Sequence, residues 1–258
     1  EEGSTILDAA KKIGIDIPTL CYHPDLSLHG ACRVCVVEDE ESGSLLASCA
    51  TPVSEDMNIN TRSAKARRAR KRNVELLLAN HPNDCLGCDR NGHCELQDIT
   101  YELGIDSDDV ERFAGDKREL ELDLEGPALK RDPNKCILCG RCVRICEEVQ
   151  GVSALQFTER GFDSIVTTAF DLPQADINCA NCGQCATVCP VGAITEMSEI
   201  KKVWRALEDD DKHVIVQTAP SIQATLGEEF GMETGTVVTG KMVAALRRIG
   251  FDKVFSTD

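Results

Sequence analysis

The chain has 258 residues, a formal net charge of −16 and 15 cysteines. The excess of acidic residues argues against a nucleic-acid binder, and no apolar stretch approaches the roughly 20 residues that a membrane-spanning helix needs. No basic start followed by an apolar run marks a secretory signal, and an odd number of closely spaced cysteines suits metal sites better than disulfides. These features predict a protein of a reducing, cytoplasmic environment, built from small domains that metal holds together.

The first predicted elements are a helix and a β-hairpin. Thr5 stands three residues before Asp8, as in a capping box, and Gly14 follows the apolar face as a stop signal. The β-branched residues Val34 to Val37, followed by a turn at Ser42–Gly43, predict a β-hairpin beside a metal-binding loop.

A basic run and an acidic run follow. Arg62 to Arg72 holds seven basic residues and no acid, and it continues through residues 73–80 as one helix that Pro82 stops. Glu95 to Glu125 holds twelve acids against three bases and predicts short helices and connectors. The basic run lacks interleaved aromatic residues, so we expect its face to lie against acidic residues of the same protein rather than nucleic acid.

An internal repeat of four-cysteine runs occupies residues 134–194. NKCILCGRCVRIC and INCANCGQCATVC align cysteine for cysteine, 43 residues apart, each with the spacing C-x2-C-x2-C-x3-C, and a polar, strand-like insertion separates them. In two-cluster bacterial ferredoxins the fourth cysteine of each run ligates the other cluster. Closely spaced cysteines also bind zinc, but two matching runs favour two [4Fe–4S] sites. The predicted ligand sets are Cys136, Cys139, Cys142 and Cys189, and Cys179, Cys182, Cys185 and Cys146.

Four further cysteines lie near the N-terminal end, with the spacing C-x10-C-x2-C-x13-C. They are Cys21, Cys32, Cys35 and Cys49. Plant-type [2Fe–2S] ferredoxins use a related layout with different spacing. A Rieske centre would need a histidine where Cys35 stands, so His23 and His29 are expected to lie outside this ligand set.

A third kind of site has one cysteine too few. Cys85, Cys88 and Cys94 remain after the other twelve are assigned, and four clusters need sixteen ligands. His81 gives the spacing H-x3-C-x2-C-x5-C at the end of a predicted helix, and we expect it to be the sixteenth ligand. His93 is the alternative, although it adjoins Cys94 and neighbouring residues seldom both reach one cluster. A carboxylate, from Asp84 or Asp89, or solvent is a further alternative.

The C-terminal part of the sequence, from Ser198 onward, has a different pattern of predicted elements. Helix signals cover Ser198 to Leu207, where the single tryptophan is expected to be packed, and HVIVQT predicts a strand. A helix then begins at Pro220 and is expected to end at Gly231, and another covers residues 239–249 ahead of the strand KVF. This pattern predicts an α/β unit.

Together, the motifs resemble the N-terminal iron–sulfur array of multi-cluster [FeFe]-hydrogenases. The start of the G-type iron–sulfur subunit of respiratory NADH dehydrogenase and of the α subunit of NAD-dependent formate dehydrogenases is similar. The tail, VIVQTAPSIQATLGEEFG followed by TGKMVAALRRIGFDKVFSTD, resembles the opening of the hydrogenase catalytic domain. The fold that this resemblance implies is α+β, a string of small iron–sulfur domains followed by the start of an α/β domain.

The resemblance also implies domain boundaries. They are a plant-ferredoxin-like [2Fe–2S] domain of the β-grasp type over 1–60, expected to lack its N-terminal hairpin; a one-histidine, three-cysteine [4Fe–4S] domain over 61–125; a two-cluster ferredoxin-like domain over 126–205; and the beginning of a catalytic domain over 206–258, expected to be truncated.

The implied function is that of an electron-transfer arm. The family suggests the [FeFe]-hydrogenase subunit of an electron-bifurcating complex linked to NAD(H) and ferredoxin. Implied cofactors are one [2Fe–2S] and three [4Fe–4S] clusters. The hydrogen-activating H-cluster is expected only in a longer protein, because no cysteine is left to hold it. No catalytic residue is therefore expected in this stretch.

Partners and alternatives follow from the same resemblance. Implied partners are a flavin and NAD(H)-binding subunit, a small [2Fe–2S] subunit and ferredoxin, in a hetero-oligomer without nucleic acid or a membrane span. The alternatives are an iron–sulfur subunit of NADH dehydrogenase (the G type) or of NAD-dependent formate dehydrogenase, and a non-catalytic electron-transfer subunit.

Overall fold

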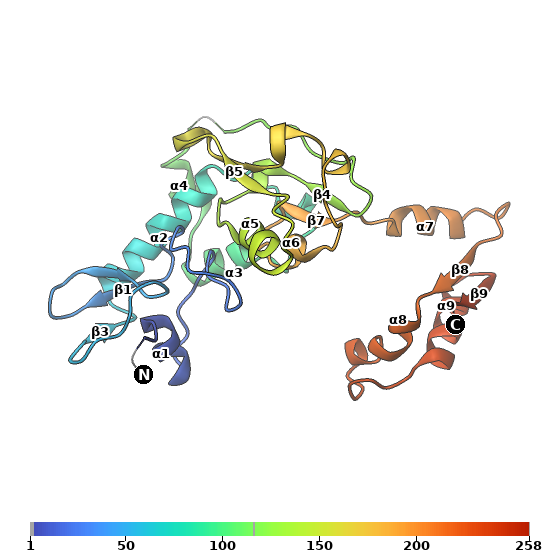
Figure 1. The fold of residues 1–258 in the computed structure, drawn as a ribbon, viewed down its shortest axis with the longest axis horizontal. Helices are drawn as coiled ribbons and strands as arrows, with labels where there is room; N and C mark the ends of the chain where they lie inside the picture. The colour runs from blue at the N-terminus through green and yellow to red at the C-terminus, as the bar shows by residue number, and fades with distance from the viewer. Residues whose placement is uncertain (1–2, 116, 258) are drawn as a thin grey trace. The chain divides into compact units, whose positions relative to one another are not determined.

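The computed structural model describes residues 3–115 and 117–257, which divide into two compact units (Figure 1). The first unit extends to Met197 and carries all fifteen cysteines, and the second begins at Ser198. The sheets are small, one of three strands and three of two strands in the described parts of the chain. This mixture of short helices and small sheets agrees with a string of small α+β domains.

The N-terminal part of the first unit is a helix beside a three-stranded antiparallel sheet in the order β2-β1-β3. Its elements are α1 (Ile6–Lys12), β1 (Val36–Asp39), β2 (Leu45–Ala47) and β3 (Ile59–Asn60). The predicted capping box is present: Thr5 Oγ1 accepts from the Asp8 N–H at 3.2 Å, and the Asp8 carboxylate accepts from the Thr5 N–H at 3.0 Å. The hairpin β1–β2 encloses the predicted turn at Ser42–Gly43.

The basic run forms one long helix, α2 (Ala64–Ala79), which ends before Pro82 as predicted. Lys71 pairs with Asp109 at 2.7 Å, so the expected contact with the acidic stretch is confirmed at this residue. Arg70, by contrast, is buried, and its guanidinium donates to the carbonyl oxygens of Val36 and Thr61, both at 2.9 Å. The acidic stretch itself forms the short helices α3 (Glu95–Glu102) and α4 (Ser107–Glu111).

The cysteine repeat lies between two paired strands. β4 (Leu129–Arg131) before the first run pairs antiparallel with β7 (Ile194–Glu196) after the second. The insertion forms a second antiparallel pair, β5 (Gln156–Thr158) with β6 (Ile165–Thr167). Each run leads into a short helix, α5 (Arg141–Arg144) or α6 (Gln184–Thr187), and α5 continues into a π-helical turn, η3 (Ile145–Val149).

The backbone of the two cysteine loops is the same. Leu138 and Asn181 occupy equivalent positions with φ of 54° and 51°, and Gly140 and Gly183 follow with φ of 69° and 78°. Left-handed backbone is rare outside glycine, so its recurrence at matched positions shows that the repeat is structural as well as sequential.

One apolar core connects the cysteine-bearing segments of the first unit. It joins buried residues from the N-terminal loop, α2, α3 and the repeat, and includes Cys21, Val34, Val74, Leu78, Leu96, Cys139, Cys142 and Cys189. The segments that carry the metal motifs are therefore packed against each other rather than strung on free linkers.

The second unit is a β-α-β arrangement. β8 (Ile215–Thr218) pairs parallel with β9 (Lys253–Ser256), and α9 (Thr239–Ile249) spans the predicted residues. The helix that begins at Pro220 is α8 (Pro220–Thr225), and it ends well before Gly231, because a separate 3₁₀ turn, η7 (Glu228–Phe230), intervenes.

The prediction that the tryptophan side chain is packed is wrong. Trp204 on α7 (Ile200–Leu207) is 49% exposed. In the described part of this unit, up to residue 257, the buried apolar side chains are Val238 and Met242. So small a core cannot also cover the apolar face of α7.

Candidate metal centres

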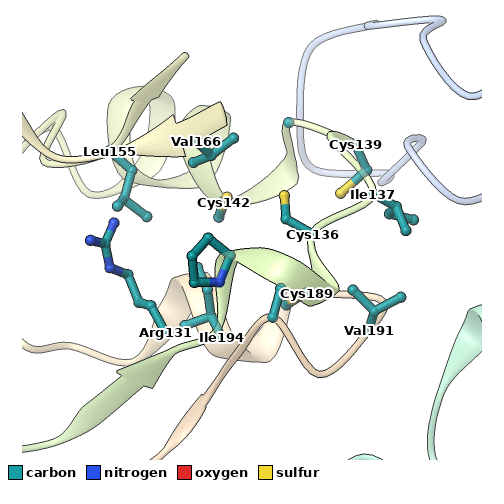
Figure 2. Close-up of a pocket in the computed structure, with 13 residues that line it drawn as sticks. Arg131, Cys136, Ile137, Cys139, Cys142, Leu155, Val166, Cys189, Val191 and Ile194 are labelled. Carbon is teal, nitrogen blue, oxygen red and sulfur yellow. The ribbon is translucent and has the colours of Figure 1, made fainter. Parts of the chain in front are cut away.

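The four cysteines of the first predicted [4Fe–4S] set line one cavity. Cys136, Cys139 and Cys142 come from the first loop and α5, and Cys189 comes from the end of the second run. Figure 2 shows the sulfur atoms of the first three around the same space, with Arg131 and Leu155 at its side. Apart from Arg131, the side chains between the cysteines are apolar: Ile137, Leu155, Val166, Val191, Ala193 and Ile194, together with Pro133.

The second predicted set lines a second cavity. Cys179, Cys182 and Cys185 come from the second loop and α6, and Cys146, the last cysteine of the first run, comes from η3. Each cavity thus combines three cysteines of one run with the fourth cysteine of the other. Sequence spacing alone predicts this exchange, and the fold brings the same four side chains together.

Backbone N–H groups point at the sulfurs of both loops. Leu138 N donates to Cys136 Sγ, and Asn181 N donates to Cys179 Sγ, both at 3.4 Å. Ala154 N donates to Cys146 Sγ at 3.2 Å. The left-handed residues Leu138 and Asn181 turn these amides inward, so the loops are shaped to stabilise negative charge on sulfur.

The N-terminal set is compact. The Cys21 thiol lies close enough to Cys32 and Cys49 for them to lower its pKa. The neighbouring Cys49 thiol likewise lowers the pKa of Cys35. Of the two nearby histidines, His29 stacks on Phe157 with ring centroids 5.9 Å apart, and His23 Nδ1 accepts from the Asp25 N–H. Both rings therefore have partners other than these thiols.

The one-histidine set is brought together in part. His81, Cys85 and Cys94 line a shared cavity beside α2 and α3. His81 is 8% exposed, and its Nε2 is buried without a hydrogen-bond partner. His93 is exposed and lies outside this cavity. A buried ring nitrogen without a partner is costly unless something binds it.

The surroundings of His81 determine whether its imidazole is charged and which ring nitrogen carries the proton. Burial lowers its pKa, which keeps the imidazole neutral. Nδ1 accepts from the Asn83 N–H at 3.3 Å, so the proton of the neutral ring sits on Nε2. Iron binding at Nε2 would move this proton to Nδ1 and break the bond to Asn83, because the two N–H groups would then face each other.

Cys88 is turned away from that cavity toward the repeat. Its sulfur lies against Gly192, where an added Cβ would be only 2.6 Å from Sγ. Arg90 Nη2 donates to the Cys189 carbonyl at 2.6 Å and the Glu95 N–H to the Pro190 carbonyl at 3.0 Å. Gly192, which no sequence motif singles out, therefore lets the end of the second run approach the third cysteine group.

The donor sets fit clusters better than single ions. Within residues 3–115 and 117–257, no three histidine, cysteine or acidic side chains are arranged to hold one metal ion. In a [4Fe–4S] cluster each ligand binds a different iron atom, so the ligands surround a larger volume than one ion requires. Burial raises the pKa of Cys136 to about 11 and that of Cys139 to about 12, so these thiols must release protons when metal binds.

Buried arginines connect the cysteine groups, a role that cysteine spacing could not reveal. Arg144 Nη2 donates to the Cys21 carbonyl at 2.6 Å and to the Cys139 carbonyl at 3.5 Å, and Nη1 donates to Ser27. Arg141 forms a bidentate pair with Glu95, at 2.6 and 2.8 Å. Such planar, multiply bonded guanidinium groups fix the separation of the groups that they join.

Family comparisons agree with the order of these groups. Residues 1–64 match a 2Fe-2S iron-sulfur cluster binding domain, and residues 70–108 match the NADH-ubiquinone oxidoreductase-G iron-sulfur binding region. Residues 126–195 match the ferredoxin-like domain of NADH-quinone oxidoreductase subunit 3, and residues 212–258 match the C-terminal domain of the iron only hydrogenase large subunit.

A solved structure of an NAD+-reducing [NiFe]-hydrogenase in the H2-reduced state contains a similar chain. The two are 36% identical with a TM-score of 0.69, over 76% of this chain and 81% of that one. The chain belongs to the iron–sulfur subunit family of NADH-quinone oxidoreductases and hydrogenases.

The curated relatives of this chain are named as oxidoreductase or hydrogenase subunits, and the chain spans less than half of their lengths. The NADP-reducing hydrogenase subunit HndD of Solidesulfovibrio fructosivorans is 49% identical over the whole chain, which spans 44% of that protein. The NADPH-Fe(3+) oxidoreductase subunit alpha of Geobacter sulfurreducens is 40% identical, and the NADH-ubiquinone oxidoreductase 75 kDa subunit of Reclinomonas americana is 43% identical. These cover 74% and 76% of the chain, which spans 22% and 27% of their lengths.

Among the described residues, every helix is too short or too polar to cross a bilayer.

Proposed function

We propose that this chain conducts electrons through one [2Fe–2S] and three [4Fe–4S] clusters. The proposed ligand sets are Cys21, Cys32, Cys35 and Cys49 for the two-iron cluster, and His81, Cys85, Cys88 and Cys94; Cys136, Cys139, Cys142 and Cys189; and Cys179, Cys182, Cys185 and Cys146 for the others. When bound, each cluster supplies one-electron transfer.

The observation that carries this proposal is the exchange of cysteines between the two cavities of the repeat. Cys189 completes the Cys136 group among mainly apolar side chains, and Cys146 completes the Cys179 group in a cavity that three glutamines also line. The matched N–H bonds to Cys136 and Cys179 prepare both loops for thiolates. Two runs with the spacing C-x2-C-x2-C-x3-C that exchange their fourth cysteine are typical of two-cluster ferredoxins, which favours [4Fe–4S] clusters over zinc.

His81 is the proposed sixteenth ligand because its buried Nε2 lacks a partner beside Cys85 and Cys94. His93 is exposed, so it is the less suitable candidate for this ligand. For Cys88 to complete the set, its side chain has to rotate from Gly192 toward His81 or the cluster has to extend toward Gly192.

The enzyme to which we assign this arm is an [FeFe]-hydrogenase subunit of an NAD(P)-linked complex. The match of residues 212–258 to the iron only hydrogenase domain and the similarity to HndD along the whole chain support it. The proposed partners are a flavin and NAD(H)-binding subunit, a small [2Fe–2S] subunit and ferredoxin. A role as the G-type iron–sulfur subunit of an NADH dehydrogenase is the second candidate, favoured by the matches over 70–108 and 126–195.

Iron analysis of the anaerobically reconstituted chain tests the cluster proposal. One two-iron and three four-iron clusters give about 14 iron atoms per chain. Zinc at stoichiometric levels, or about 10 iron atoms with every remaining cluster fully occupied, would remove one of the assigned sites. To separate the two enzyme candidates, the complete native complex is assayed for hydrogen-dependent NAD(P)+ reduction, which an NADH dehydrogenase would lack.

A further inference from the structure

Gln174 is a buried amide beside the second cysteine cavity. It is 4% exposed, and its Nε2 donates to Cys179 Sγ at 3.2 Å. Its Oε1 is buried without a hydrogen-bond partner. Burying the Gln174 side-chain carbonyl without a hydrogen-bond partner costs free energy. Packing alone does not explain why a polar amide occupies this position and faces sulfur.

The position of this amide is fixed from behind. The Gln174 main-chain N–H donates to Asp123 Oδ2 at 2.9 Å, and the same oxygen accepts from Arg131 Nε at 3.1 Å. Gly126 lies beside the same side chain, since a Cβ on Gly126 would be in ordinary van der Waals contact with Gln174 Cβ, at 3.7 Å. These contacts hold the side chain in place and direct its amide at Cys179.

The two halves of the repeat differ at this position. Both loops share the 3.4 Å backbone bond to their first cysteine. The residue 43 positions before Gln174 is Arg131, and it directs Nε to Asp123 rather than to Cys136. The side-chain N–H bond to sulfur therefore distinguishes the second cavity from the first.

We propose that Gln174 raises the reduction potential of the cluster held by Cys179, Cys182, Cys185 and Cys146. This inference rests on the proposed function, since it requires a cluster in that cavity. Reduction adds negative charge that spreads onto the sulfurs, and an N–H dipole aimed at Cys179 stabilises the more negative state. Gln174 acts through Cys179 and so is a positioning residue for electron transfer.

The test is an EPR-monitored redox titration of the full reconstituted chain and its variants. Gln174→Met keeps the size of the side chain without an N–H donor, and Gln174→Glu replaces the donor with a carboxylate. Gln156→Met, on exposed β5, is the matched control, and Cys182→Ala identifies the signal by removing it. Iron content is measured for each variant.

Both Gln174 variants are expected to keep about 14 iron atoms and to lower the midpoint potential of the assigned signal. A tenfold shift in the electron-exchange equilibrium, about 59 mV for one electron, is the expected size for Gln174→Met. Gln174→Glu should lower it at least as far, while the other cubane signals and the Gln156→Met control stay unchanged.

Each other outcome has a distinct meaning. Three cubane signals with the assigned potential unmoved in Gln174→Met would overturn this inference alone. Loss of the cluster in both Gln174 variants would show that the residue holds the cluster rather than sets its potential, which also overturns it. Fewer than three cubane signals in the unaltered protein would overturn the cluster assignment together with this inference.

Discussion

Gly192→Ala should loosen one cluster and leave the other three in place. The new Cβ would stand 2.6 Å from Cys88 Sγ, which is about 1 Å inside the normal contact distance of about 3.5–4.0 Å for heavy atoms. Lys135 Cδ at 3.6 Å and Arg90 Cβ at 3.7 Å close the remaining space. The sulfur must therefore move.

The size of the effect depends on whether Cys88 is a ligand. A free thiol rotates away at little cost, but a thiolate bound to iron is held by its bond. Overpacking of a site that cannot relax costs about 1–3 kcal/mol, which corresponds to about a 5- to 150-fold weaker hold on the cluster. The metal-free protein should unfold at nearly the same temperature with or without the substitution.

Chelator-driven iron loss is the assay for this prediction. The reconstituted variant is challenged with an iron chelator, and the loss of each cubane is followed by EPR. Gly87→Ala is the matched control, because Gly87 lies in the same cysteine loop and a Cβ there meets nothing within 4 Å. If Gly192→Ala retains its clusters as well as Gly87→Ala, then Cys88 does not hold iron beside Gly192, and the steric reasoning fails.

Three further outcomes are expected. His81→Cys should keep a cubane but lower its reduction potential, because four thiolates leave the site about one charge more negative than three thiolates and an imidazole. His81→Ala should weaken or abolish one cubane signal in EPR titrations. If His93→Ala abolishes that signal and His81→Ala does not, then His93 is the ligand. Arg144→Leu should lower the thermal unfolding midpoint, since it leaves the buried carbonyls of Cys21 and Cys139 without this donor, at a cost of about 1–3 kcal/mol each. Exposed Arg68→Leu is its control, and equal midpoints would refute the bridging role. Residues 1–258 alone should accept electrons from dithionite but neither evolve nor consume hydrogen, and any turnover of hydrogen by this chain would contradict the assignment of all fifteen cysteines.

Local signals in the sequence predicted most of the elements. The Thr5–Asp8 box, the stop before Pro82 and the residues 239–249 all correspond to observed helix boundaries, because caps and helix breakers act within one turn of the chain. The grouping of Cys146 with the second run was also predictable, since the exchanged fourth ligand follows from spacing.

Contacts between distant segments could not be predicted from the sequence. Arg70 and Arg144 look like surface charges in the sequence, yet both are buried, where they satisfy carbonyl oxygens of distant segments. The exposed Trp204 shows the opposite error, because an apolar helical pattern does not state whether its own unit is large enough to cover it. Gln174 precedes its loop at a position without any motif, and only the fold shows that it faces Cys179.

The exchange of cysteines between the two cavities sets an order of events during synthesis. Cys136, Cys139 and Cys142 leave the ribosome well before Cys189, which completes their cavity, and at about 5–20 residues per second several seconds pass in between. The N-terminal cysteines and the His81 group are each local in sequence and can close earlier. A nascent chain that pauses within the β5–β6 insertion therefore presents the four thiols of the first run, from Cys136 to Cys146, with neither ligand set complete, open to oxidation or to a foreign metal. Pausing there should make the yield of intact clusters depend on oxygen far more than pausing after β7.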